Sequence, residues 1–147
     1  MGFKEEIKSK FENNHLMAAV NIIYTANWLR DVSAPIYKKH NILSQHYNIL
    51  RIVNGSYPKP VSPGYIKEVM LDKGRDLTRL VDKLVKLGYV ERQLSKNNRR
   101  KMEITITQSG INIIEIIGEE ILDLYSSYKI NEQEAFQLSN LLDKLRE

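Results

Sequence analysis

The sequence predicts a mostly α-helical protein with one small β-hairpin, and three observations support this prediction. Apolar residues recur at helical spacing over most of the 147 residues. Two short runs of strand character, residues 89–94 and 101–107, flank a polar, basic turn. The composition, with 42% hydrophobic and 27% charged residues, is that of an ordinary globular protein, and the length fits one domain over residues 1–147.

Two helices are expected in the N-terminal third of the chain. Aromatic and aliphatic residues at helical spacing predict a first helix over residues 3–30. Pro35 should end or interrupt that stretch, because proline lacks the N–H that a helix interior requires. A second helix is expected to start at Ser44, a residue type that caps helices, and to stop at Asn54-Gly55.

Two further helices are expected before the hairpin. The proline-rich segment 56–62 is a loop, and a short third helix should run from Pro63 to Met70 with Ser62 as its cap. A fourth helix is expected from about Lys73 to Leu87, capped by Asp72 and closed by Gly88.

The fourth helix has one apolar side and one side rich in Arg and Lys. Near its predicted N-terminus lie Arg75, Thr78 and Arg79, whose side chains suit hydrogen bonding to base edges in a major groove. Asp82 dilutes this positive charge, although it can pair with Lys86 four residues later. An exposed amphipathic helix that binds nothing remains the alternative.

The basic charge concentrates in the middle of the chain. The net charge is +4 overall, and residues 67–101 hold 11 Lys and Arg against 5 Asp and Glu. The turn from Lys96 to Lys101 has four positive charges and no acid, which suits a minor groove or a line of phosphates. This asymmetry favours a polyanionic partner, with a solvated basic face as the alternative.

The C-terminal part should form two helices that need a partner. From Ser109 onward, apolar residues occupy more than one face of the predicted helix, as expected of a helix buried on several sides. In a chain this small, that pattern indicates a second subunit. A final helix opens at Asn131 with a capping-box pattern completed by Glu134, and it has a stripe of leucines.

The order of elements is that of a helix-turn-helix followed by a β-hairpin wing, and the sequence resembles the MarR family of transcriptional regulators. The resemblance covers roughly residues 40–115. Four segments carry it: Leu77-Thr78-Arg79-Leu80-Val81-Asp82-Lys83-Leu84, Gly88-Tyr89-Val90-Glu91-Arg92, Asn98-Arg99-Arg100 and Ile106-Thr107-Gln108-Ser109-Gly110.

The resemblance implies a homodimer whose terminal helices interlock, with each subunit offering a recognition helix and a wing to a pseudo-palindromic DNA site. The dimerisation helices would then lie in about residues 1–34 and 109–147, and the winged-helix lobe in about residues 41–107. The expected DNA contacts are Lys73, Arg75, Thr78, Arg79, Lys83, Lys96, Arg99, Arg100 and Lys101. The expected dimer interface contains Phe11, Ile117, Leu138, Leu141, Leu142 and Leu145.

The resemblance also implies regulation, because many family members release DNA when a small, often aromatic anion binds between the dimer and DNA-binding parts. Tyr24, Trp28 and Tyr47 are candidate walls of such an effector site, with ordinary core packing as the alternative. Two features depart from the family pattern. Asn98 replaces the usual Asp that pairs with the Arg two residues later, here Arg100, and a proline-rich loop precedes the third helix.

No enzyme, cofactor or metal site is expected. The chain has no Cys, no phosphate-binding loop and no Ser/His/Asp arrangement. His15, His40 and His46 are not at metal-ligand spacing, and no acid lies beside His40 or His46 in the sequence. The charged N-terminal residues lack the apolar run of a signal peptide, so a cytoplasmic protein is expected.

The sequence therefore predicts a DNA-binding transcriptional regulator, a homodimeric repressor that a small-molecule effector releases. A winged-helix module that docks an acidic protein partner is the alternative hypothesis.

Overall fold

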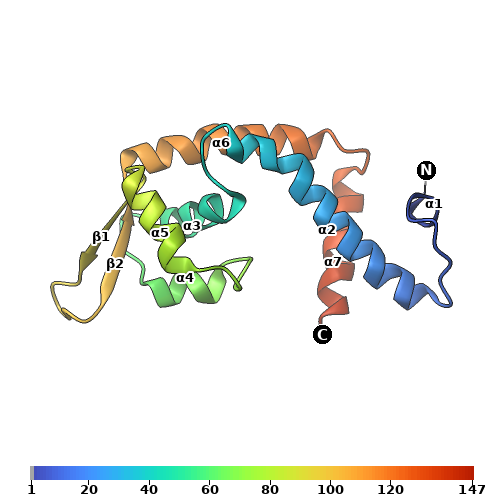
Figure 1. The fold of residues 1–147 in the computed structure, drawn as a ribbon, viewed down its shortest axis with the longest axis horizontal. Helices are drawn as coiled ribbons and strands as arrows, with labels where there is room; N and C mark the ends of the chain where they lie inside the picture. The colour runs from blue at the N-terminus through green and yellow to red at the C-terminus, as the bar shows by residue number, and fades with distance from the viewer. Residues whose placement is uncertain (1) are drawn as a thin grey trace.

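The computed structural model describes residues 2–147, which form seven helices and one antiparallel hairpin (Figure 1). In chain order these elements are α1 (Phe3–Glu6), α2 (Asn14–Lys38), α3 (Ser44–Gly55), α4 (Pro63–Val69), α5 (Leu77–Lys86), β1 (Val90–Leu94), β2 (Met102–Ile106), α6 (Gln108–Ser126) and α7 (Glu132–Leu145). The predicted fold class, mostly α with a small hairpin, is confirmed.

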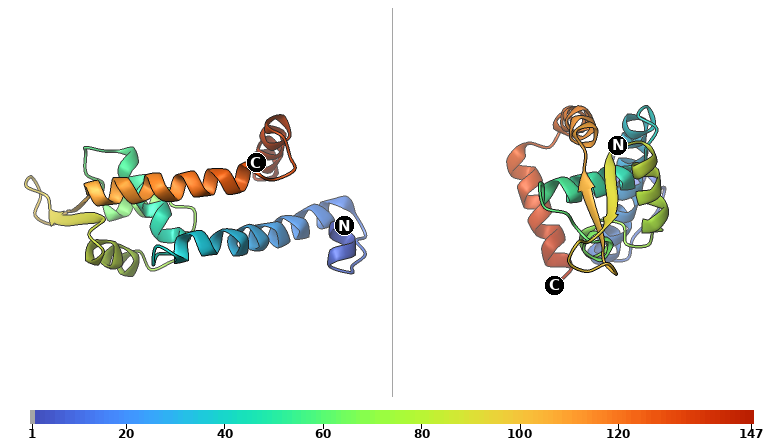
Figure 2. Two further views of the ribbon diagram at one scale, coloured as in Figure 1. Left: turned by 90° about the horizontal axis from the view of Figure 1, so that it is seen from above. Right: turned by 90° about the vertical axis from the view of Figure 1, so that its left-hand side faces the viewer.

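The elements divide into a winged lobe and an opposite end. Figure 1 shows α3, α4, α5 and the hairpin gathered at one end, and α1, α7 and the start of α2 at the other. Helices α2 and α6 run lengthwise between the two ends (Figure 2). The side chains of Ile49, Leu50, Ile66, Leu84 and Ile104 are fully buried in the lobe, and Ile117 of α6 belongs to the same core.

The hairpin is held against the lobe by a bridge to the loop before α4 and by its close approach to α6. Val90 pairs with Ile106 at its base, and Ile104 makes a further bridge to Val61 in the loop before α4. At the base of the hairpin, a Cβ on Gly110 would lie 2.2 Å from the carbonyl oxygen of Tyr89. Only glycine therefore lets the start of α6 pack directly against the strand that follows α5.

The expectation of one helix over residues 3–30 is wrong. Helix α1 ends at Glu6, and α2 begins at Asn14, where the Asn13 side chain accepts a hydrogen bond from the Leu16 N–H at 2.8 Å. Pro35 does not end α2, which continues to Lys38. Because Pro35 and the residue four positions before it are exposed, water can replace the hydrogen bond that proline removes.

The predicted start of the recognition helix is also wrong. Helix α5 begins at Leu77 and not at Lys73, because the cap is Asp76, whose side chain accepts from the Arg79 N–H. Asp72 instead closes a turn by accepting from the Gly74 N–H at 3.2 Å. Residues 73–76 therefore form part of the turn between α4 and α5.

Most other predicted helix ends agree with the structure. Ser62 caps α4, Gly88 follows α5 with a φ of 78°, and Asn131 and Glu134 form the capping box of α7. At α3 the cap position is Leu43, and the His46 ring nitrogen Nδ1 accepts its N–H at 2.9 Å. Within residues 2–147, no helix is long and apolar enough to cross a membrane.

Candidate nucleic-acid interface

Helix α5 packs one side on the lobe and presents the other to solvent. Its buried residues are Leu77, Leu80, Val81 and Leu84. Thr78 and Arg79 lie in its exposed first turn, as the sequence predicted, while Lys83 is half-buried. The free N-terminal turn of α5 thus offers a hydroxyl and a guanidinium group as hydrogen-bonding groups.

The turn before α5 holds two of the predicted DNA contacts, Lys73 and Arg75, which lie beside the recognition helix and not on it. The Arg75 Nε donates to the Asp72 Oδ2 at 3.2 Å, with both side chains about half exposed. Hydrogen bonds from the Gly74 N–H, Gln45 and Arg75 hold the pKa of Asp72 below its usual value. The Nε contact leaves both Nη groups of Arg75 for another acceptor.

An ion pair joins α5 to the wing. The Arg92 Nη1 on β1 donates to the Asp82 Oδ1 on α5 at 2.5 Å. The expected pairing of Asp82 with Lys86 is therefore wrong, because the strand that follows α5 brings a guanidinium group within reach. This pair offsets the charge of the acid on the exposed side of α5 and joins that helix to the hairpin.

The wing tip is a tight basic turn organised by Asn98. The Ser95 N–H donates to the Lys101 carbonyl at 2.8 Å, and the Lys101 N–H donates to the Asn98 carbonyl at 2.9 Å. The Asn98 Oδ1 accepts from the backbone N–H of Arg100 at 3.1 Å, so this side chain supports the turn itself. The four basic side chains of the tip are exposed: Lys96, Arg99, Arg100 and Lys101.

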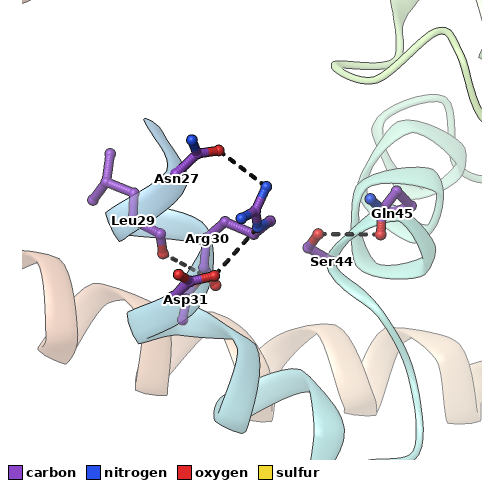
Figure 3. Close-up of polar contacts among 7 residues, drawn as sticks. Asn27, Leu29, Arg30, Asp31, Ser44 and Gln45 are labelled. Carbon is purple, nitrogen blue, oxygen red and sulfur yellow. Dashed lines mark hydrogen bonds and ion pairs between the residues drawn. The ribbon is translucent and has the colours of Figure 1, made fainter. Parts of the chain in front are cut away.

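A cavity of about 1000 Å³ lies between the lobe and the long helices. Its walls include Arg30 of α2, Gln45 and Arg51 of α3, and Tyr125 of α6. Arg30 bonds to Asn27 and Asp31 on its own helix and faces Ser44 and Gln45 across the gap (Figure 3). Two arginines and several tyrosines could hold a small aromatic anion here.

The three predicted effector-site aromatics do not form one site. Tyr47 lines the large cavity and packs against Tyr37, with ring centroids 5.6 Å apart. Tyr24 and Trp28 line a separate cavity of about 440 Å³ beside α1. The trio fails because Tyr24 and Trp28 lie in the part of α2 that is remote from α3.

His40 and His46 are partly or fully buried, while His15 is exposed. The His40 ring lies 3.4 Å from Glu120 of α6, although no acid is near it in the sequence. His46 is buried, and this burial, together with the charge of Lys83, lowers its pKa to about 4. Within residues 2–147, no group of three or more His, Cys, Asp and Glu side chains could hold a metal ion.

The predicted dimer interface needs one correction. Ile117 is 0% exposed and packs in the core of its own chain, so it offers no surface to a partner. Leu138, Leu141 and Leu145 of α7 are 49%, 65% and 59% exposed. Leu142 and Phe11 are partly covered, Phe11 by stacking on Phe3.

Sequence reasoning missed polar contacts that connect separate elements, among them Asp82 with Arg92 and Gln45 with Asp72. Arg92 had a detectable signal, because it lies in a strand directly after the basic helix. Gln45 had none, since its partner is 27 residues away in the sequence.

The fold, with an exposed helix beside a basic hairpin, is that of a winged helix-turn-helix protein. Similarity to known proteins identifies the family within this class. The regulator SarZ of Staphylococcus haemolyticus is 30% identical over 105 residues, which is 71% of this chain and 70% of SarZ. PapX of Escherichia coli, another HTH-type transcriptional regulator, is 24% identical over 114 residues, 75% of this chain and 70% of PapX. No family model matches the chain.

Solved structures share the fold. A mutant of E. coli MarR in complex with operator DNA superposes with a TM-score of 0.75 at 24% identity, covering 92% of this chain and 99% of MarR. A MarR-like regulator of Bacillus cereus superposes with a TM-score of 0.77 at 18% identity, covering 90% and 96% of the two chains. The chain belongs to the MarR family of HTH-type transcriptional regulators.

Proposed function

We propose that this chain acts as a homodimeric repressor that reads a pseudo-palindromic DNA site. The observation that carries the proposal is that the exposed side of α5 and the basic wing belong to one lobe, with Asp82 and Arg92 joining the two. A helix end and a hairpin held in fixed relation can enter a major groove and the adjacent minor groove together. The solved complex of the E. coli relative with operator DNA supports DNA as the partner.

Each predicted basic residue has a place in this proposal. Thr78 and Arg79 would contact base edges from α5, with Arg75 reading from the preceding turn. Arg99 or Arg100 would enter the minor groove, where the potential is most negative. The remaining residues would contact phosphates and contribute no sequence preference: Lys73, Lys83, Lys96 and Lys101.

The dimer in this proposal forms through the exposed leucines of α7 and the terminal part of the chain near Phe11. An exposed stripe of leucines on a helix with no buried residue is costly in water, and a second copy would cover it. A two-fold axis would place two recognition helices on successive turns of the same DNA face.

A small aromatic anion in the 1000 Å³ cavity is the proposed effector. Arg30 and Arg51 supply positive charge, and Tyr37 and Tyr47 supply aromatic walls. The cavity touches both the long helices and the turn before α5, so an occupant can favour a lobe orientation that does not fit DNA.

The test is selection of bound sequences from random duplex DNA, followed by titration of the selected site and of shuffled DNA at several salt concentrations. Arg79→Ala should lower the preference for the selected site by about 1–3 kcal/mol. Lys96→Ala should weaken both DNAs alike and reduce the salt slope, because it removes a phosphate contact. Equal affinity of the wild-type protein for selected and shuffled DNA, together with binding to an acidic peptide, would favour the protein-docking alternative.

A further inference from the structure

Asp72, in the turn between α4 and α5, accepts hydrogen bonds from three directions. The Gly74 N–H reaches its Oδ1 at 3.2 Å, which closes the turn. The Arg75 Nε and the Gln45 Nε2 both reach its Oδ2, at 3.2 Å and 3.5 Å. One carboxylate therefore joins an arginine on the DNA-facing side to a glutamine on α3.

The α3 side of this network is part of the cavity wall. Ser44, Gln45, Asn48, Leu71 and Asp72 all line the cavity. The Ser44 hydroxyl donates to the Gln45 Oε1 at 3.3 Å (Figure 3), so the amide of Gln45 is turned with its NH₂ group toward Asp72. The Asn48 Oδ1 accepts the Leu71 N–H at 2.9 Å, which holds the same turn against α3.

We infer that Asp72 and Gln45 are positioning residues that set the direction of the Arg75 guanidinium group and so determine base preference. This inference rests on the proposed function, because it requires the turn before α5 to face DNA. An arginine fixed through Nε keeps both Nη groups for a bidentate contact with guanine. It also loses less side-chain freedom on binding than an unrestrained arginine does.

The network places part of the specificity of the protein in the wall of its cavity. Gln45 acts on base reading through Asp72 and Arg75, so a change at Gln45 alters discrimination between base pairs. Phosphate contacts from the wing and from Lys73 do not depend on this network, so affinity for random DNA and its salt slope stay the same.

The experiment is a double-mutant cycle on discrimination. A site selected by the wild-type protein is compared with all its single-base variants for the wild-type protein, Arg75→Ala, Gln45→Met and the double variant. Arg75→Ala should lose about tenfold discrimination at one base pair of each half-site. Gln45→Met, similar in length but without a donor, should lose about threefold at that same base pair. The double variant should match Arg75→Ala, because Gln45 acts only through the arginine.

Two further variants keep the test decisive. Asn54→Ala also changes the cavity wall, but the Asn54 side chain makes no hydrogen bond to the turn in the described residues, so discrimination should stay at the wild-type level. Asp72→Asn keeps an oxygen for the Gly74 N–H but removes the charged Oδ2 that accepts from Arg75 and Gln45, so discrimination should be lost at the same base pair. This variant tests the inference even if Gln45→Met lowers stability.

The results distinguish a failure of this inference from a failure of the proposed function. Wild-type discrimination in Gln45→Met and Asp72→Asn, with a loss in Arg75→Ala, overturns the inference and leaves the proposed function standing. Wild-type discrimination in Arg75→Ala, or a Gln45→Met effect that persists in the Arg75→Ala background, also overturns it. Absence of any base preference in the wild-type protein overturns the proposed function itself.

Discussion

The winged lobe and the opposite end of this protein differ in how much of their apolar surface they bury within the chain. In the lobe, α3, α4 and α5 each bury apolar residues, and α6 completes their core with Ile113, Ile114 and Ile117. At the opposite end, neither α1 nor α7 has a buried residue, and α7 leaves Phe136 and Leu141 about two-thirds exposed. The lobe is stabilised by its own chain, and the other end has apolar surface that a second copy can cover.

The largest expected effect comes from the core of the lobe. Leu84→Ala removes a fully buried side chain and should lower the free energy of unfolding by about 2–5 kcal/mol. Urea denaturation at fixed protein concentration measures this loss. Leu145→Ala, at a 59% exposed position, is the matched control, and its smaller effect should depend on protein concentration. If both variants lost the same free energy of unfolding at every protein concentration, the distinction between the two regions would be wrong.

The next effect concerns assembly. Leu141→Asp should cost about 3 kcal/mol or more of dimerisation free energy, because it buries an unpaired charge at the subunit interface. Sedimentation should show a wild-type dimer and a variant monomer, and the variant should lose DNA affinity. Asn140→Asp, outside the leucine stripe of α7, should stay dimeric. A wild-type monomer at micromolar concentration would refute this prediction.

Low pH should lower the free energy of unfolding of the lobe, because His46 binds a proton more readily when the chain is unfolded. Its pKa is lowered to about 4 in the folded chain, against about 6.5 when unfolded, so the unfolded chain binds more protons between these values. The free energy of unfolding should therefore fall as the pH drops from 6.5 to 4, by about 3 kcal/mol at most. His46→Asn keeps an acceptor for the Leu43 N–H and should flatten this part of the pH profile, whereas His15→Asn should not.

The smallest effect is expected at the wing. Asn98→Asp keeps the oxygen that accepts from the Arg100 N–H, so the turn should persist. The new charge can hold the Arg100 guanidinium group, worth a few tenths to about 1 kcal/mol, but it also repels phosphates. We expect slightly tighter binding to the selected site, by less than about fivefold. Arg100→Ala should weaken binding more than this change strengthens it, and titration of both variants measures the difference.

The sequence predicted those features that depend on local chemistry. Ser62 before Pro63, Gly88 after α5 and the capping box of Asn131 and Glu134 are short-range signals, and each is present in the structure as expected. The failures occurred where two local signals competed. Asp72 and Asp76 are both good caps, and the first is occupied by the turn around Gly74, so the helix starts after the second.

Contacts between distant segments could not be predicted. Apolar periodicity shows that Ile117 faces a core, but it does not distinguish the core of the chain from that of a dimer. Tyr24, Trp28 and Tyr47 share a chemistry that suits a ligand, yet their separation in space follows from the length and direction of α2. The exposure of most basic residues could be predicted, because charge needs no partner to stay on a surface.

The ion pair between Asp82 and Arg92 bears on the shape of DNA that the proposed complex would accept. The pair joins α5 to β1, so in the proposed complex the helix and the wing would meet the two grooves of the DNA at a spacing that folding has already set. A duplex whose groove geometry matches that spacing would then be bound with little orientational entropy lost in arranging the wing. Stretches of DNA with a wider minor groove would be rejected by shape alone, before any base edge is read.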